Sequence, residues 1–124
     1  MTILEAKCGS LLNEKEVLFV GLINKRGRLV AGGFKTGVSS IEDEAERQKF
    51  YMEYVLMASM RKDFDYYLGP ERYTVSKRET ISMISFSVDQ AIFLVAVDPK
   101  EDIEKEASKI EKIIATGFSY AQPC

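Results

Sequence analysis

The chain combines two patterns of hydrophobic and polar positions, and together they predict a mixed fold. Apolar residues recur at helical spacing over residues 2–13, 39–62 and 98–116. Short apolar or alternating runs predict strands over residues 17–23, 28–32, 72–77, 81–88 and 91–97. The order α-β-β-α-β-β-β-α closes most simply as a five-stranded antiparallel sheet with packed helices, an α+β fold.

Turn residues and alternation fix most of the predicted strands. Asn24-Lys25-Arg26-Gly27 suits a hairpin turn between the first two strands, because Gly tolerates the positive φ that such a turn needs. The glycines that follow predict a loop over residues 33–38. Residues 83–88 alternate with period two, as expected of a sheet with one buried face. Ala91–Val97 has no polar face, which predicts a central strand covered on both sides.

Capping residues predict where the two later helices begin. Ser39 and Glu42 have the spacing of a capping box, so we expect the long helix to begin there and to end near Lys62. Asp98 followed by Pro99 is typical of a helix N-terminus, with Glu101 completing a second box. The apolar stripe of this last helix comprises Ile103, Ala107, Ile110, Ile113 and Ile114.

The long middle helix carries more apolar surface than one sheet can cover. Of the eleven residues from Phe50 to Met60, only Glu53 and Ser59 are polar. One stripe is predicted to face the sheet: Ile41, Ala45, Met52, Leu56 and Ser59. A second stripe has residue types enriched at protein interfaces: Arg47, Phe50, Tyr51, Tyr54, Met57, Ala58 and Arg61. We predict that a second copy or partner covers this second stripe; cover by the chain's own loops or first helix is the alternative.

Composition excludes several classes of protein. Hydrophobic residues make up 46% and charged residues 29%, which is typical of a soluble globular domain. A net charge of −2 argues against a nucleic-acid binder. Neither a signal peptide nor a membrane span is predicted, so we expect one cytoplasmic domain over residues 1–124, with 118–124 as a tail. Cys8 and Cys124 are expected to be reduced thiols, with a bridge between them as the alternative.

No catalytic, metal or cofactor motif is predicted. The chain has no histidine to activate Cys8. Gly27–Thr36 lacks the Lys-Ser/Thr that should directly follow a phosphate-binding loop. We therefore expect a protein that is not an enzyme. Basic residues near the end of the long helix are interpreted as solvated charge; the alternative is a patch for an acidic partner, formed by Lys62, Arg72, Lys77 and Arg78 beside Arg61.

The chain resembles the roadblock family of dynein light chains and that family's prokaryotic relatives, which regulate small GTPases. Phe19–Ile23 followed by Gly27–Ala31 is similar to the family's first hairpin, and Phe93–Asp98 is similar to its last strand. This resemblance implies a profilin-like or longin-like architecture. It also implies a homodimer that pairs central helices and third strands, and that scaffolds a complex or holds a small GTPase. No residue matches an arginine finger, so GTPase activation is not implied.

Two further comparisons remain open from the sequence. Tyr67–Gly69 and Arg72–Tyr73, with residues 93–99, resemble a small archaeal family of uncharacterised proteins. The alternative function is a small-molecule sensor of the PAS or GAF kind, since those folds also pair helices with a five-stranded antiparallel sheet. Such a sensor needs a pocket between helix and sheet, which we would place among Met52, Leu56, Met83 and Phe86.

Overall fold

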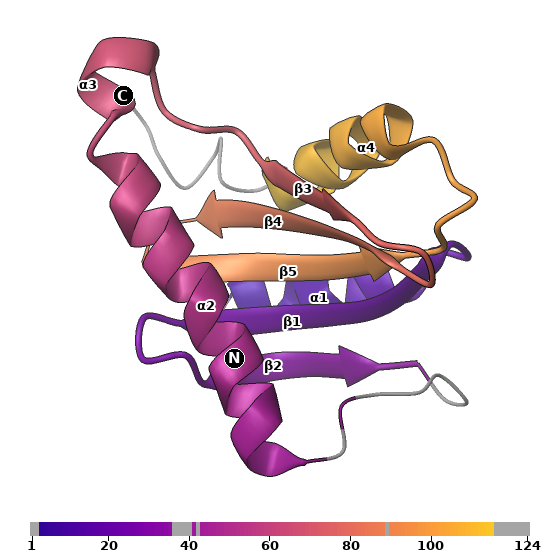
Figure 1. The fold of residues 1–124 in the computed structure, drawn as a ribbon. Helices are drawn as coiled ribbons and strands as arrows, with labels where there is room; N and C mark the ends of the chain where they lie inside the picture. The colour runs from indigo at the N-terminus through magenta and orange to yellow at the C-terminus, as the bar shows by residue number, and fades with distance from the viewer. Residues whose placement is uncertain (1–2, 36–40, 42, 89, 116–124) are drawn as a thin grey trace.

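A five-stranded antiparallel sheet lies at the centre of the molecule (Figure 1). The computed structural model describes residues 3–35, 41, 43–88 and 90–115. The strands lie in the order β2-β1-β5-β4-β3, which confirms the predicted fold class and the central place of β5. The elements are α1 (Ile3–Leu12), β1 (Val17–Asn24), β2 (Leu29–Phe34), α2 (Glu44–Lys62), α3 (Asp65–Leu68), β3 (Thr74–Lys77), β4 (Ser82–Val88), β5 (Ala91–Val97) and α4 (Ile103–Ala115).

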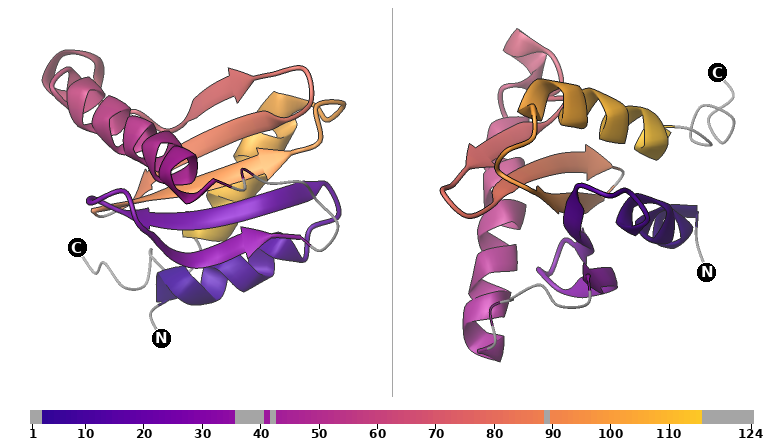
Figure 2. Two further views of the ribbon diagram at one scale, coloured as in Figure 1. Left: turned by 60° about the horizontal axis from the view of Figure 1, so that its bottom comes forward. Right: turned by 90° about the vertical axis from the view of Figure 1, so that its right-hand side faces the viewer.

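Helices cover the two faces of the sheet unequally. Figure 2 shows α1 and α4 side by side on one face and α2 alone on the other. We call these the closed face and the α2 face. On the closed face, Cys8 and Leu11 of α1 and Ala107 and Ile110 of α4 are fully buried against the sheet. The predicted apolar stripes of both helices are therefore confirmed, and Cys8 is a buried free thiol.

The first hairpin differs in one respect from its prediction. β2 continues to Phe34, so Gly33 and Phe34, which were predicted to lie in a loop, pair with β1. A glycine is required at Gly32, which has φ of 93°, because a Cβ there would lie 2.0 Å from the carbonyl oxygen of Val20. Gly32 therefore allows the backbones of β1 and β2 to approach closely.

Helices α2 and α4 begin later than predicted. Asp43 caps α2, its carboxylate accepting a hydrogen bond from the Glu46 amide at 3.0 Å. The predicted capping residues Ser39 and Glu42 lie outside the described residues. The α4 prediction was wrong: Asp98 forms a turn by accepting from the Lys100 amide. The helix begins at Ile103, after Asp102 accepts from the Lys105 amide.

A charged cluster attaches α4 to the start of β1. Lys109 forms ion pairs with Glu14 at 2.7 Å and Glu16 at 2.5 Å. Glu106 is buried and hydrogen-bonds to Glu16. Burial, more than the hydrogen bond to Glu16 and its charge, raises the pKa of Glu106 to about 7. The Lys109 hydrogen bond lowers the pKa of Glu16 to about 2. Glu106 therefore holds its proton to a higher pH than an ordinary glutamate, whereas Glu16 is held ionised.

Candidate interaction surface around α2

The inner face of α2 packs on the sheet through two tyrosines. Tyr51 and Tyr54 are 5% and 7% exposed and lie among the side chains of a buried cluster on the α2 face. The Tyr54 hydroxyl donates to the Ser76 Oγ on β3 at 3.5 Å. Ala58 also packs against this cluster. These three residues were assigned to the interface stripe, and that assignment of faces was wrong, because the chain's own sheet covers them.

The outer face of α2 is open and carries exposed apolar side chains beside the charged residues Lys49 and Glu53. Met52, Leu56 and Met60 are 36%, 55% and 68% exposed. Ile41 and Ala45, from the same predicted stripe, are exposed too. The stripe expected to face the sheet therefore faces outward, and the excess of apolar surface lies on the opposite side of the helix from the one predicted.

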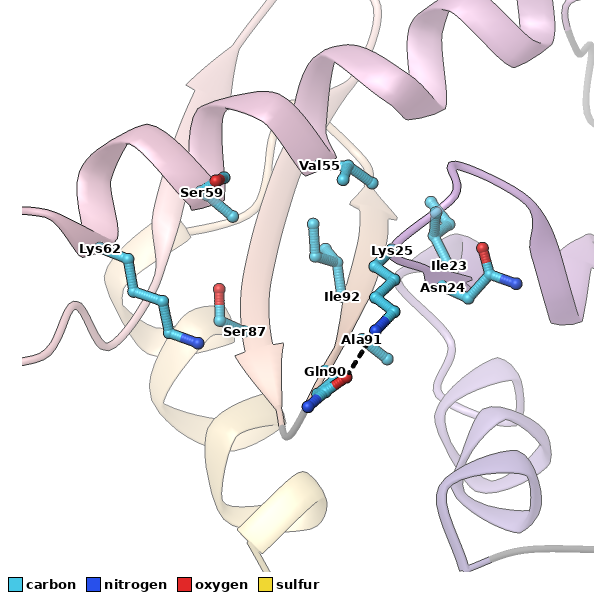
Figure 3. A pocket seen from close by; sticks show the side chains of 11 residues that line it. Ile23, Asn24, Lys25, Val55, Ser59, Lys62, Ser87, Gln90, Ala91 and Ile92 are labelled. Atoms are coloured by element: carbon cyan, nitrogen blue, oxygen red, sulfur yellow. Dashed lines mark hydrogen bonds between the residues drawn. The ribbon is translucent and has the colours of Figure 1, made fainter.

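One flank of α2 borders a small hollow with a polar rim, shown in Figure 3. It has a volume of about 240 Å³ and lies over the turns that join β1 to β2 and β4 to β5. The side chains of Ser59, Lys62 and Ser87 line it, and the Lys25 Nζ donates to the Gln90 Oε1 at 3.2 Å. Polar side chains therefore line this flank of α2.

The other flank borders a larger, apolar hollow of about 550 Å³. The hollow lies beside Phe50 and reaches the turn between β3 and β4. Its walls are mainly apolar, with the guanidinium groups of Arg47 and Arg78 also on the lining. The complete lining comprises Leu18, Phe19, Phe34, Ile41, Arg47, Phe50, Tyr51, Arg78, Thr80, Ile81, Met83 and Ala96. At 100° per residue, Met57 lies within about 20° of Phe50 on this flank, whereas Met60 lies toward the outer face.

The chain after α2 forms an exposed apolar protrusion that was not predicted. We call Phe64–Leu68 the knob; it contains α3 and projects beyond the β3 edge of the sheet (Figure 1). Four of its side chains are largely exposed: Phe64 58%, Tyr66 92%, Tyr67 78% and Leu68 81%. The backbone of the knob is nevertheless held in one conformation. The Gly69 amide donates to the Asp65 carbonyl at 2.8 Å, and Gly69 ends α3 with φ of 84°.

The strand beneath the end of α2 forms one edge of the sheet. β3 pairs with β4, and in the described part of the chain no strand pairs with its other side. Arg61 connects this edge to α2, donating to the Thr74 Oγ1 at 3.0 Å and pairing with Glu71 at 3.2 Å. The edge, the end of α2 and the knob thus form one continuous region.

The basic residues that could have formed a patch for an acidic partner, the alternative interpretation, are dispersed. Arg72 pairs with Glu111 of α4 at 2.6 Å, and Lys77 donates to the Pro99 carbonyl. Lys62 lies at the polar hollow and Arg78 at the apolar one. These hollows lie at opposite ends of β4, which at about 3.3 Å per residue are roughly 20 Å apart. The four residues therefore do not form one patch.

The pocket that we predicted for a small-molecule sensor does not form. Met83 lies in the cluster on the α2 face, whereas Phe86 lies in the cluster on the closed face. Met52 and Leu56 are exposed on the outer side of the helix. Within the described residues, no cluster of acidic or cysteine side chains could hold a metal ion, and no helix has the length and apolarity to cross a bilayer.

Comparison with known proteins identifies both a family and a fold. Residues 1–120 match the model of DUF6659, a family of unknown function. The chain belongs to this family. No curated protein matches it significantly.

Solved structures that resemble this DUF6659 chain include a roadblock/LC7 domain and MglB proteins. A roadblock/LC7 domain from Streptomyces avermitilis superposes with a TM-score of 0.67 at 10% identity, covering 97% of this chain and 98% of that one. The gliding protein MglB from Thermus thermophilus gives 0.68 at 12% identity, covering 94% and 91%. MglB from Myxococcus xanthus gives 0.68 at 13% identity, covering 97% and 98%. The predicted roadblock fold is therefore confirmed.

Proposed function

We propose that this DUF6659 protein is a non-enzymatic homodimeric interaction module that regulates or scaffolds a small GTPase. The observation that carries the proposal is the open apolar side of α2 next to the unpaired edge of β3. Leaving several large apolar side chains in water costs about 1.5–3 kcal/mol each relative to burial. A second copy beside the helix would cover the flank that carries Phe50 and Met57.

The geometry supports a particular dimer. Two β3 edges can pair antiparallel around a two-fold axis perpendicular to the sheet, which gives one continuous sheet with both α2 helices on the same face. The helices then run antiparallel, and the C-terminal end of each helix, where Arg61 bonds to Thr74 of β3, is the end nearer the two-fold axis (Figure 1). Phe50 and Met57 of the predicted interface lie on the flank that faces the second helix.

The GTPase part of the proposal rests on the roadblock fold and on the family resemblance in the sequence. A structure titled MglB with a tetrameric arrangement shares this fold, with a TM-score of 0.68 at 13% identity and coverage of 98% and 95%. That protein assembles from several copies, and we extend assembly to this chain. A two-copy platform with an apolar surface is suited to hold another protein.

Light scattering after size-exclusion chromatography tests the dimer. The wild type should have twice the 14.0 kDa chain mass at micromolar concentration. A Met57→Glu, Met60→Glu variant should be monomeric and folded, whereas the matched control Ser59→Glu, exposed on the polar flank of the same helix, should remain dimeric. A wild-type monomer would overturn the proposal.

A GTPase partner is tested by affinity capture from the native source. Wild-type protein should retain a chain that carries bound guanine nucleotide, identified by mass spectrometry and nucleotide chromatography. The Met57→Glu, Met60→Glu variant should lose it. Capture of proteins without guanine nucleotide, or equal capture by the monomeric variant, would contradict the GTPase part and leave the dimer intact.

A further inference from the structure

We propose that the knob of each copy fills the apolar hollow of the other copy, so that the two chains clasp one another. This inference rests on the proposed dimer and names the contact that completes it. The knob is an exposed apolar projection, and the hollow of about 550 Å³ is an apolar depression on the same face of the sheet.

Symmetry places the two features together. α2 covers the part of the sheet next to the turns that join β1 to β2 and β4 to β5, while the hollow lies toward the turn between β3 and β4. Rotation by 180° about an axis beside β3, perpendicular to the sheet, carries the second α2 to the opposite side. The second helix and its knob therefore pass over the first copy's hollow.

The chain is long enough to reach. α2 passes over β3 at Arg61, which hydrogen-bonds to Thr74. The next six residues pass through the end of α2 and into α3, and a fully straight helix of that length would extend about 9 Å, which sets the upper limit of the reach. Strands lie about 4.8 Å apart, so this length spans the partner's β3 and β4. Tyr66 and Tyr67 then lie above Ile81 and Met83 of the second copy, on the floor and rim of the hollow.

Charge favours the same arrangement. Asp63 and Asp65 flank the start of the knob, whereas the hollow is lined by Arg47 and Arg78. Opposite charges therefore meet when the knob enters, and a guanidinium group can stack on a tyrosine ring. The acidic residues beside the knob also disfavour an anionic membrane as the occupant.

The area of the knob matches what a stable dimer needs. Large side chains bury roughly 150–250 Å² each, so the four exposed knob side chains offer about 600 Å². A standard interface buries roughly 800 Å² per partner. Met52, Leu56 and Met60 of α2 fall well short of this area alone, and the knob supplies most of the remainder.

The knob is also prepared for binding. Glu71 receives hydrogen bonds from Arg61 and, at 2.7 Å, from the Thr74 hydroxyl, which fixes the chain that leaves the knob. The Leu68 and Gly69 amides donate to carbonyls within the knob at 2.9 and 2.8 Å. Little backbone freedom remains to be lost on docking, which favours affinity.

The first test compares dimer dissociation constants by analytical ultracentrifugation. Tyr66→Ser, Tyr67→Ser and Leu68→Ser combined should weaken the dimer about 100-fold, and the folded chain should tolerate them because these side chains are exposed. Arg78→Glu, at the hollow, should weaken it about tenfold. The control Lys25→Glu at the polar hollow should leave the constant unchanged. An unchanged constant in the knob variant would overturn the clasp.

A disulfide test locates the contact. In a Cys124→Ser background, Tyr67→Cys with Ile81→Cys should give a covalent dimer on non-reducing gels, and each single variant should give far less. If the wild type is monomeric, the proposed function fails and the clasp with it. If it is a dimer that Met57→Glu, Met60→Glu dissociates, but neither knob test responds, only the clasp fails.

Discussion

The two faces of the sheet differ in how far helices cover them. On the closed face, α1 and α4 lie side by side and bury Leu11, Ala107 and Ile110 completely. On the other face, the single helix α2 buries Tyr51 and Tyr54 and leaves an apolar hollow beside it. Its side away from the sheet, the outer ridge, exposes Met52, Leu56 and Met60. The closed face is fully packed within the chain, whereas the half-covered face is the one on which we propose that a second copy binds.

The largest effect should come from opening the closed face. Phe93 is fully buried there. Phe93→Ala should lower the free energy of unfolding by about 3–5 kcal/mol, since it removes apolar contacts and leaves a cavity. Urea denaturation monitored by circular dichroism measures the change. A loss below about 1 kcal/mol would mean that this face is not a packed core.

A smaller effect is expected where the first hairpin touches α2. Gly27 adopts φ of 78°, and a Cβ there would lie 3.2 Å from the Met52 sulfur. Gly27→Ala should cost about 1–2 kcal/mol, because an L side chain is strained in this region. Gly9→Ala, on the exposed surface of α1, is the control and should be neutral or stabilising. Thermal denaturation of both variants, at a concentration where the chain is monomeric, tests the difference.

The charged cluster on the closed face predicts a pH-dependent stability. The pKa of Glu106 rises from 4.5 when unfolded to about 7 when folded. The folded chain therefore retains a proton that the unfolded chain loses in this window, so the free energy of unfolding should fall as pH rises from 4.5 to 7. The lowered pKa of Glu16 acts oppositely, and its stabilisation is lost as pH falls from 4.5 toward 2.

Glu106→Gln isolates the first of these contributions. The amide is neutral at every pH and keeps a donor for Glu16, so the decline in stability between pH 4.5 and 7 should be reduced. Denaturation midpoints at several pH values test this. Parallel profiles for wild type and variant would show that Glu106 does not carry the extra proton.

The smallest effect on folding is expected on the outer ridge of α2. Leu56 is 55% exposed, so Leu56→Ser should change the monomer's free energy of unfolding by less than about 0.5 kcal/mol. The same substitution should leave the proposed dimer intact, because Leu56 points away from the sheet and not toward the second helix. Urea titrations at two protein concentrations separate the two quantities. A large loss at low concentration would place Leu56 in the core and contradict the half-covered face.

The sequence predicted the sheet and the closed face well because each pattern there has one interpretation. Ala91–Val97 has no polar side and lies at the centre, and the stripe of Ala107, Ile110 and Ile114 is the only apolar side of its helix. The sequence offered two N-caps for α4, because Asp98 and Asp102 can each cap a helix. In the structure the helix begins after Asp102, with Ile103 packed against the closed-face core.

The faces of α2 could not be assigned from periodicity. Both stripes recur at helical spacing and both are apolar, so only tertiary contact determines which one lies on the sheet. The Tyr54 hydroxyl finds Ser76 there, and that contact depends on the placement of β3. The knob escaped prediction for a different reason: its helix has four residues, too few for a periodic signal.

The contact between α1 and α4 has a practical consequence. The Lys7 ammonium group donates to the Ile113 carbonyl at 2.7 Å, which holds the first and last described helices together behind the sheet. Ala6 and Ser108 are exposed on these helices. A fluorophore or a surface linker attached at either position would lie on the closed face, away from α2. The molecule can therefore be immobilised for binding measurements while the α2 face remains accessible.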